Sequence, residues 1–277
     1  MADVTEADLV QSMVGRQLGD YYPARATTAA DKAKPVLHVS NLTRRRAGRV
    51  CFKDISFELR RGEILGISGL VGAGRTELLE TLFGAADHEW SGTIELDGRQ
   101  IRPSSPANAI DLGIGLVTED RGGLGIFRQQ SVLANATIAK WKALARFGLV
   151  ARRREREALE KHGAIMKIRR ASDAIPIESL SGGNQQKVIL TRWLMTNPKV
   201  LLLDEPTRGI DVGAKSEIYK VLRRLADDGI GILFVSSEMP EVLGLADRIL
   251  VLSAGRLTAD LAAADATETT LLEAAMA

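Results

Sequence analysis

The sequence predicts an α/β fold with three parts: a buried parallel-sheet core, a small antiparallel β layer and a helical insertion. A continuous apolar strand at residues 63–68 leads through a glycine-rich turn into a helix, which is typical of a buried parallel sheet. Short alternating strands surround it, and residues 128–175 carry only polar and alanine-rich helical patterns. With 277 residues and 45% apolar side chains, the chain can bury a sizeable core.

Composition excludes several functions. Thirty-seven basic and thirty-five acidic side chains leave a formal charge of +2, which gives no global attraction to nucleic acid or to an anionic membrane. The single cysteine, Cys51, excludes an internal disulfide framework and fits a reducing cytosol. No run approaches the ~20 apolar residues that cross a bilayer, and Asp3, Glu6 and Asp8 stand where a secretory signal is positive. We therefore expect a chain that does not span a membrane alone.

The amino-terminal 34 residues are predicted to be a separate segment. Apolar residues recur at roughly helical intervals over residues 4–18, which indicates a short amphipathic helix. The following stretch, "GDYYPARATTAADKAKP", is rich in Ala, Thr and Pro and is typical of a linker. The remaining domain is expected to cover residues 35–277.

The first half of this domain begins with alternating strands at residues 36–42 and 50–60, and with a third segment at 91–101 that turns at Asp97–Gly98. Between them, the buried strand 63–68 leads into a helix from about Gly74 to Phe83, stopped by Gly84. These patterns predict the antiparallel layer and the first strand of the parallel core.

The second half alternates helices and strands after the helical region. We expect a helix over 183–196, a strand over 200–204, a helix from about 213, a strand over 231–237 and a final hairpin over 248–261. The basic run at residues 151–170 mixes charges of both signs without aromatic residues, so a solvated helical face is preferred to a nucleic-acid patch.

The stretch "SGLVGAGRTELL" suggests a phosphate-binding loop. It matches G-x-x-x-x-G-K-[ST] except that arginine replaces the lysine, and it lies between a buried strand and a helix. Glycines allow backbone N–H groups to close around phosphate oxygens, and the helix N-terminus adds partial positive charge. The arginine guanidinium is bulkier than the lysine ammonium and donates its hydrogen bonds from a planar fork. We therefore expect nucleotide binding to tolerate the replacement better than the transition state of hydrolysis does. The residues assigned to nucleotide binding here are Gly69, Gly72, Gly74, Arg75, Thr76 and Glu77.

Two further motifs carry chemistry. In "KVLLLDEPTRGID", Asp204 ends an apolar strand and is expected to hold Mg²⁺ together with Thr76, while Glu205 polarises the attacking water. In "LSGGNQQKVILTRWL", Ser181 opens a helix, so that a hydroxyl and free N–H groups face an approaching anion. Ser181, Gly182 and Gly183 are therefore candidate anion-binding residues, and Glu205 is the candidate catalytic residue.

The three motifs, in this order and spacing, resemble the nucleotide-binding domain of an ABC transporter over residues 36 to about 275. The resemblance implies a P-loop NTPase (RecA-like) core with an antiparallel β subdomain and a helical subdomain at about 125–180. It also implies ATP and Mg²⁺ as cofactors. In that family the LSGG segment of one domain closes over ATP held by the phosphate loop of a second domain, so a single chain is half of each site. The resemblance therefore implies that Ser181, Gly182 and Gly183 belong to the catalytic group with Glu205.

Departures from the family pattern narrow the resemblance. An ungapped alignment puts Arg46 where the family stacks an aromatic residue on adenine. Glu119 stands at the position of the glutamine that senses Mg²⁺ and the transmembrane partner, and Ser237 at that of the histidine contacting the γ-phosphate. With Arg75, these replacements imply a pocket that binds nucleotide and turns it over slowly or not at all.

The combination "GAGRTEL", "TEDR", "LSGGNQQK" and "SSEMPEVLGLADRI" resembles the carboxyl-terminal half of the duplicated ATPase of ribose-, xylose- and galactose-type importers. The resemblance implies ATP hydrolysis coupled to sugar transport in a complex on the cytosolic face of the membrane, with this half supplying its LSGG signature to the other half's ATP site. The implied partners are a second ATP-binding half, transmembrane permease subunits and, indirectly, a periplasmic sugar-binding protein. "SMVGRQLGDYYP" resembles the stretch joining the halves, which implies that Met1 starts one domain of a longer reading frame.

Two alternatives stay open: a self-sufficient homodimeric ATPase, supported by intact Asp204 and Glu205, and a soluble ABC-type protein acting on ribosomes or nucleic acid. The second is disfavoured because no long charged arm interrupts residues 36–275. The family resemblance further implies a permease-docking groove near Glu119 and residues 120–140, with Arg121 and Arg128 in contact. The apolar part of that stretch is equally well explained as core of the helical subdomain.

Overall fold

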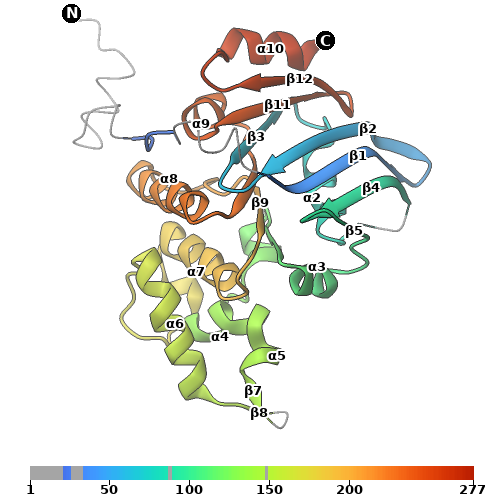
Figure 1. Cartoon of the computed structure of the whole chain (residues 1–277). Coiled ribbons are helices and arrows are strands. Elements are labelled where there is room, and N and C mark those ends of the chain that lie inside the picture. Colours follow the sequence, from blue (N-terminus) through green and yellow to red (C-terminus); the bar gives the residue numbers. More distant parts are fainter. Residues whose placement is uncertain (1–20, 26–33, 87–88, 147–148) are drawn as a thin grey trace, which may run out of the picture.

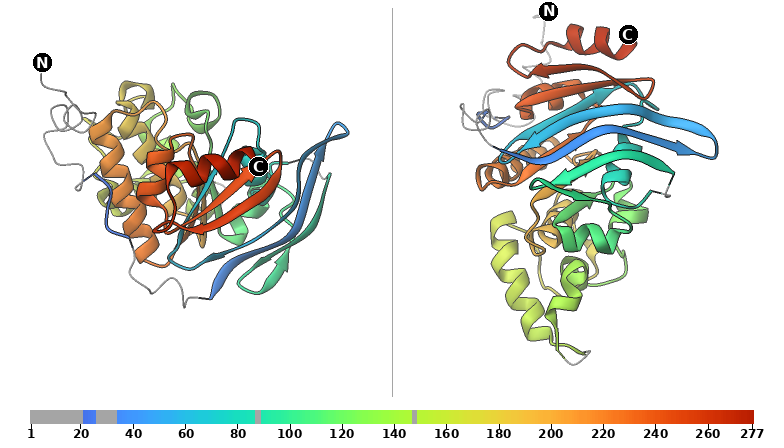
Figure 2. Two further views of the ribbon diagram at one scale, coloured as in Figure 1. Left: turned by 90° about the horizontal axis from the view of Figure 1, so that it is seen from above. Right: turned by 45° about the vertical axis from the view of Figure 1, so that its right-hand side comes forward.

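The computed structural model describes residues 21–25, 34–86, 89–146 and 149–277. Two β-sheets and their covering helices form one body, and a lobe of helices extends from the end opposite the carboxyl-terminal helix (Figures 1 and 2). The helix predicted over residues 4–18 lies outside the described residues. Among the described residues, no helix is both long and apolar enough to cross a membrane.

The main sheet has six strands in the order β12-β11-β3-β10-β9-β6, and every neighbouring pair except β11–β12 is parallel. Its inner strands are continuous apolar runs, buried because helices cover the sheet. The strands are β3 (Ile64–Gly69), β6 (Ile114–Val117), β9 (Val200–Asp204), β10 (Gly231–Val235), β11 (Arg248–Ser253) and β12 (Arg256–Ala262).

The second sheet is antiparallel, in the order β2-β1-β4-β5. Its core-facing residues alternate with exposed ones along β2, which is the pattern of a sheet with one solvated face. The predicted Asp97–Gly98 turn joins β4 to β5. The strands are β1 (Pro35–Arg46), β2 (Arg49–Arg60), β4 (Trp90–Leu96) and β5 (Arg99–Ile101).

The helix that follows the glycine-rich turn, α2 (Arg75–Leu82), lies between the two sheets and contacts β2, β3 and β9. It has caps at Gly74 and Phe83, the two ends predicted from the sequence. Three further helices border the main sheet (Figure 1). They are α8 (Val212–Asp227), α9 (Met239–Leu245) and α10 (Glu268–Met276).

The helical lobe packs around α7 (Gly182–Leu194), which also contacts β6 and α8. Its other members are α4 (Val132–Thr137), η4 (Ile138–Lys140), α5 (Trp141–Leu144), α6 (Arg152–Met166) and the short turn η5 (Ile177–Ser179). The exposed charged side of α6 confirms a solvated face for much of the basic run.

Five short elements lie where the sequence patterns predicted none. Ser105 caps α3 (Pro106–Leu112), and β6 follows it directly. Both are short, so hydrophobic periodicity carries little signal, and β6 forms because β9 offers it a free edge. Inside the helical region, β7 (Ala145–Arg146) pairs with β8 (Leu149–Val150), and near the site η3 (Arg121–Gly125) forms one π-helical turn.

Candidate functional site

The phosphate-binding loop of the sequence leads from β3 into α2. Gly74, the N-cap of α2, has φ 93°, and a Cβ there would come within 2.8 Å of the Cys51 carbonyl oxygen. Glycine is therefore required at this position for both conformation and space. Among the described side chains none caps α2, so its first N–H groups are available to an anion, as the loop motif predicts.

Arg75 reaches from the first turn of α2 to the end of β10. Its Nη1 atom donates a hydrogen bond to the carbonyl oxygen of Ser236 at 3.0 Å. The guanidinium is thus tied to backbone on one side, and its remaining N–H groups can donate to a phosphate. A lysine ammonium has no planar fork of N–H groups. Arg75 would therefore approach a phosphate with a different hydrogen-bond geometry from the lysine of the motif.

Asp204 ends β9 beside the loop, as predicted. Its side chain is 3% exposed, and its Oδ1 oxygen has no hydrogen-bond partner among the described residues. Burial raises the pKa of Asp204, while a hydrogen bond from Thr76 and the charge of Arg75 lower it. An unpartnered buried carboxylate oxygen beside a hydroxyl fits Mg²⁺, which takes one or two protein ligands and completes its shell with phosphates and water.

No cluster of three or more His, Cys, Asp or Glu side chains suited to a metal occurs in the described part of the chain. A metal at this site would accordingly depend on nucleotide phosphates for most of its ligands, with Thr76 and Asp204 from the protein. The chemistry that Mg²⁺ supplies when bound is neutralisation of developing phosphate charge.

Glu205 follows β9 with φ 46°, a left-handed conformation uncommon outside glycine. Its Oε2 atom accepts a hydrogen bond from Ser237 Oγ at 3.1 Å. Burial raises the pKa of Glu205, and the hydrogen bond from Ser237 opposes the shift. Two residues assigned from sequence, Glu205 and Ser237, are therefore in direct contact, and the raised pKa suits a carboxylate that accepts a proton.

The signature segment forms the N-terminus of α7. Ser181 is the N-cap, but its side chain is exposed and does not cap the helix; its Oγ instead accepts from Asn184 Nδ2 at 3.0 Å. A Cβ at Gly183 would come within 2.6 Å of the Cβ of Ala214 in α8, so glycine permits close packing of the two helices. The helix end is left open to an approaching anion.

The loop and the signature lie on two different helices of the chain. The carboxyl-terminal ends of α2 and α7 meet where Phe83 packs edge-on against Trp193, with ring centroids 5.7 Å apart. The N-termini, which carry the loop and the signature, therefore lie at the ends of the two helices away from this contact.

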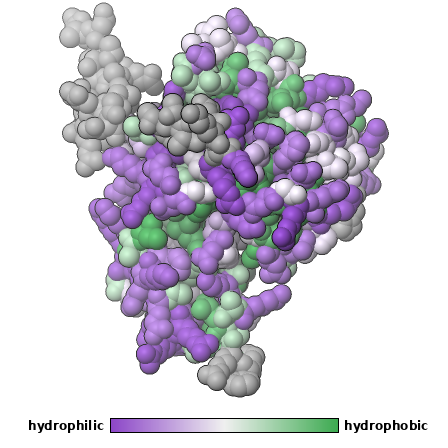
Figure 3. Space-filling model, in the orientation of Figure 1, coloured by the Kyte–Doolittle hydropathy of each residue, from purple (hydrophilic) through white to green (hydrophobic). Residues whose placement is uncertain are grey.

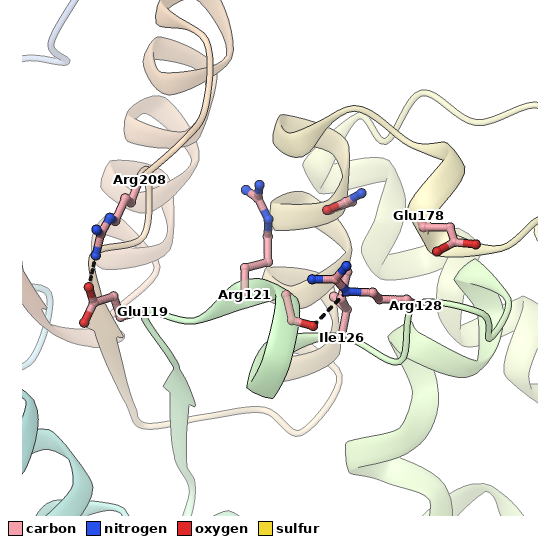
Figure 4. A pocket seen from close by; sticks show the side chains of 8 residues that line it. Glu119, Arg121, Ile126, Arg128, Glu178 and Arg208 are labelled. Carbon is pink, nitrogen blue, oxygen red and sulfur yellow. Dashed lines mark hydrogen bonds and ion pairs between the residues drawn. The ribbon is translucent and has the colours of Figure 1, made fainter.

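A polar pocket of about 400 Å³ lies beside the signature (Figure 4). Glu119 forms an ion pair with Arg208 at one side, while Arg128 donates from Nε to the Gly122 carbonyl oxygen at 3.1 Å on the other. Arg121 extends between them and donates from Nη1 to the Gly182 carbonyl oxygen at 3.3 Å. Figure 3 shows a largely hydrophilic face in which exposed hydrophobic residues are scattered.

Arg46 stands apart from these groups. It is exposed at the end of β1, opposite Arg49, and Arg44 instead turns inward to contact the Glu77 carbonyl oxygen and Glu80. Glu77 itself is half-buried in the first turn of α2. The assignment of Arg46 to adenine stacking stays a prediction.

Sequence reasoning missed Arg208 and Glu241. Arg208 lies in the quoted "DEPTRGID" and pairs with Glu119. Glu241 is 1% exposed and accepts hydrogen bonds from Thr207 and Ser236. A glutamate in the first turn of a short helix is normally solvated, so no sequence signal marked its burial.

An open glycine-rich loop, a buried strand-end carboxylate and a second open helix define an ATP-binding domain of the P-loop type. Residues 52–208 match the ABC transporter family, and the chain belongs to it. Members of this family bind ATP, typically with Mg²⁺, and hydrolyse it.

The relatives are import proteins. A ribose import ATP-binding protein of Streptomyces coelicolor is 45% identical over 98% of this chain and 52% of its own length. A xylose import ATP-binding protein of Geobacillus kaustophilus is 42% identical over 98% of this chain and 54% of its own length. The chain thus spans about half the length of the curated relatives it matches, consistent with one half of a duplicated protein.

Solved structures agree on the fold. An ATP-binding cassette of an ABC transporter superposes with a TM-score of 0.74 at 21% identity, covering 87% of this chain and 99% of the other. The cbiO1 protein of Clostridium perfringens, part of the cbiONQ transporter complex, gives 0.70 at 26% identity over 87% and 92%. The predicted ABC ATPase fold is confirmed.

Proposed function

We propose that this chain is the carboxyl-terminal ATP-binding half of a sugar ABC importer and that it donates Ser181, Gly182 and Gly183 to ATP held by the other half. The open N-terminus of α7, whose serine hydroxyl is exposed instead of capping its own helix, carries this proposal. A pre-formed helix end with an exposed hydroxyl that can still donate stabilises phosphate charge without reorganisation.

The chain's own loop is proposed to bind Mg-ATP and to hydrolyse it slowly. Support comes from Arg75, which is tied to the Ser236 carbonyl oxygen, and from Ser237, which hydrogen-bonds Glu205 at the position of the family's γ-phosphate histidine. Removing one donor that stabilises transition-state charge typically slows an enzyme about 10²-fold or more. Thr76 and Asp204 supply the Mg²⁺ ligands, and Glu205 orients the attacking water.

The proposed partners are a second ATP-binding half, permease subunits at the cytoplasmic face of the membrane and, indirectly, a periplasmic sugar-binding protein. The names of the ribose and xylose import relatives support a sugar as cargo. The pocket between Glu119 and Arg128 is the proposed contact with the permease, because it adjoins the signature and its charges are accessible. Charge swaps at Arg121 or Arg128 are expected to weaken transport.

The first experiment is calorimetric binding of Mg-ATP to the purified chain, with steady-state ATPase on the same sample. We expect binding with turnover far below that of a complete transporter. Glu205→Gln should leave binding intact, because the amide keeps the shape of the side chain but cannot accept a proton. Turnover comparable to a complete transporter that Glu205→Gln abolishes would contradict the proposal.

A self-sufficient homodimer is the second candidate, favoured by the Thr76–Asp204 pair, which keeps the elements of a Mg²⁺ site. In that case two copies would each supply loop and signature to the other. ATPase activity rising with protein concentration and ATP-induced dimers in ultracentrifugation would support it. A monomer at high protein concentration with ATP would exclude it.

A further inference from the structure

The segment Tyr21–Arg25 lies against α8 and α9, where Figure 1 draws it as the short blue stretch beside α9. Tyr22 stacks on Tyr219 of α8 with ring centroids 5.2 Å apart and an interplanar angle of 23°. Tyr21 meets Tyr219 edge-on at 5.6 Å. This three-ring cluster joins the linker to the helix that follows the Asp204–Asp211 stretch.

A glycine in α9 makes room for this contact. A Cβ added at Gly244 would lie 2.5 Å from the ring of Tyr22, so the ring rests directly on the backbone of α9. Next to it, Arg25 Nη2 donates to the Leu243 carbonyl oxygen at 2.5 Å. The linker is therefore held by an aromatic stack, a close backbone approach and a hydrogen bond.

The ring cluster adjoins a buried carboxylate, Glu241. Its two oxygens accept hydrogen bonds from the hydroxyls of Thr207 and Ser236, and the side chain is 1% exposed. Burial and the nearby carboxylate, which is hydrogen-bonded to the Tyr219 hydroxyl, raise the pKa of Tyr219. The stacked ring of Tyr22 covers Tyr219, and Tyr219 in turn contacts Glu241.

Both partners of Glu241 belong to turns that carry site residues. Thr207 lies two residues after Glu205, in the turn that leaves β9. The carbonyl oxygen of Ser236 accepts a hydrogen bond from Arg75. The next residue, Ser237, donates a hydrogen bond to Glu205. The Glu241 carboxylate thus bonds to both of the segments that contact Arg75 and Glu205.

We propose that the linker segment positions the nucleotide site: Tyr22, through Tyr219 and Glu241, holds the Thr207 and Ser236 turns in the arrangement that Arg75 and Glu205 require. Tyr22, Tyr219 and Glu241 are positioning residues and do not touch nucleotide. The inference rests on the proposed nucleotide site of this chain. In a protein whose linker joins this chain to a second ATP-binding half, a displacement of that half would move Tyr22. Through the stacked ring of Tyr219, this movement would shift the two turns of the site.

Gly244→Ala tests the coupling because its two effects oppose each other. Alanine raises helix propensity in α9, which by itself stabilises the helix. The added methyl also displaces Tyr22, which the proposal expects to loosen the turns on the far side of Glu241. Gly163→Ala is the matched control, since the nearest atoms to a Cβ there belong to Leu159, Ile168 and Arg170 at 3.4, 3.6 and 4.0 Å, which are ordinary van der Waals distances.

The primary measurement is amide hydrogen exchange of the full chain without nucleotide, in peptides covering residues 205–208 and 236–239. We expect exchange at least about fivefold faster in Gly244→Ala and Tyr22→Ala, the lower end of typical coupling between sites. Tyr22→Phe, which keeps the ring, and Gly163→Ala should match the parent chain. Unchanged exchange in both Gly244→Ala and Tyr22→Ala, or an equal change in Gly163→Ala, would overturn the proposal.

Binding of Mg-ATP by calorimetry is the second measurement. The dissociation constant should rise about fivefold in Gly244→Ala and Tyr22→Ala and recover in Tyr22→Phe, which a general loss of stability would not produce. If the parent chain binds no Mg-ATP, the proposed nucleotide site of this chain fails, while the exchange result still decides whether the linker holds the two turns.

Discussion

Two carboxylates at the end of β9 have similar chemistry but different surroundings. Asp204 is buried beside Thr76 with one oxygen that no described residue bonds, whereas Glu205 accepts a hydrogen bond from the Ser237 hydroxyl and has a left-handed backbone. The first arrangement suits a metal ligand and the second a group that orients water. Backbone strain at Glu205 is tolerated because the surrounding turn determines it.

Asp204→Asn should stabilise the folded chain at neutral pH. The pKa of Asp204 is raised in the folded state, so its ionised form disfavours folding above its unfolded pKa, and this penalty disappears below about pH 4, where the carboxyl is protonated in both states. We expect the free energy of unfolding at pH 7 to rise by roughly 1 kcal/mol, a gain typical of replacing a functional-site residue whose buried charge destabilises the fold.

The measurement is urea unfolding at pH 7 and below about pH 4 without Mg²⁺ or nucleotide. The advantage of Asp204→Asn should shrink as pH falls through the folded pKa, while Mg-ATP affinity is reduced at neutral pH. The exposed Asp265→Asn serves as control and should stay within about ±0.5 kcal/mol at both pH values. A destabilised Asp204→Asn at pH 7 would show that the carboxylate is structural.

At the level of elements, α7 combines an open end with a tightly packed first turn. Ser181 does not cap the helix, and Gly183 lets it approach α8 at Ala214. The two residues therefore have separable roles in the same signature. We propose that Ser181 acts only on an anion that approaches the helix end, whereas Gly183 is also needed for the packing of α7 against α8.

Ser181→Ala should leave stability almost unchanged, although removing a true N-cap serine costs about 1 kcal/mol. Gly183→Ala should destabilise by roughly 1 to 3 kcal/mol from overpacking against Ala214, partly offset by about 1 kcal/mol of helix propensity. Chemical denaturation of both variants checks the two predictions, through the denaturant midpoint and the slope of the unfolding free energy with denaturant concentration. A Ser181→Ala variant as destabilised as Gly183→Ala would show that the hydroxyl serves the helix itself.

At the scale of the whole molecule, Arg192 joins α7 to the rest of the helical lobe. It is 7% exposed and donates to the carbonyl oxygens of Asn135 at 2.7 Å and Gly125 at 2.8 Å. Burial lowers the pKa of Arg192 to about 10. Asn135 also bonds the backbone of Phe127, so this network fixes the chain segment that follows the Glu119 pocket.

Arg192→Met should destabilise the chain by roughly 3 kcal/mol, because a buried apolar side chain leaves two carbonyl oxygens without their donors. Thermal unfolding followed by circular dichroism measures the loss. Arg153→Met in α6, whose parent side chain is 90% exposed, should shift stability by no more than about 0.5 kcal/mol. Equal effects of the two substitutions would mean that the lobe does not depend on this network.

Much of this fold was predictable because its core strands are long apolar runs and its turns carry glycine at diagnostic positions. The strand 200–204, the ends of α2 and the Asp97–Gly98 turn agree with the structure. The elements that were missed, such as β6 and the β7–β8 pair, are short and form because a neighbouring strand supplies hydrogen bonds. Nothing local in their sequence specifies that partner.

The sequence by itself determined the family, the order of the three motifs and the departures at Arg75, Glu119 and Ser237, because these depend on residue identity and spacing along the chain. Only the tertiary structure decided which groups meet: Ser237 with Glu205, Arg208 with Glu119, and the linker tyrosines with Tyr219. Contacts between residues far apart in the chain depend on how the sheet and helices pack. A buried carboxylate such as Glu241 shows its partners only when those elements come together.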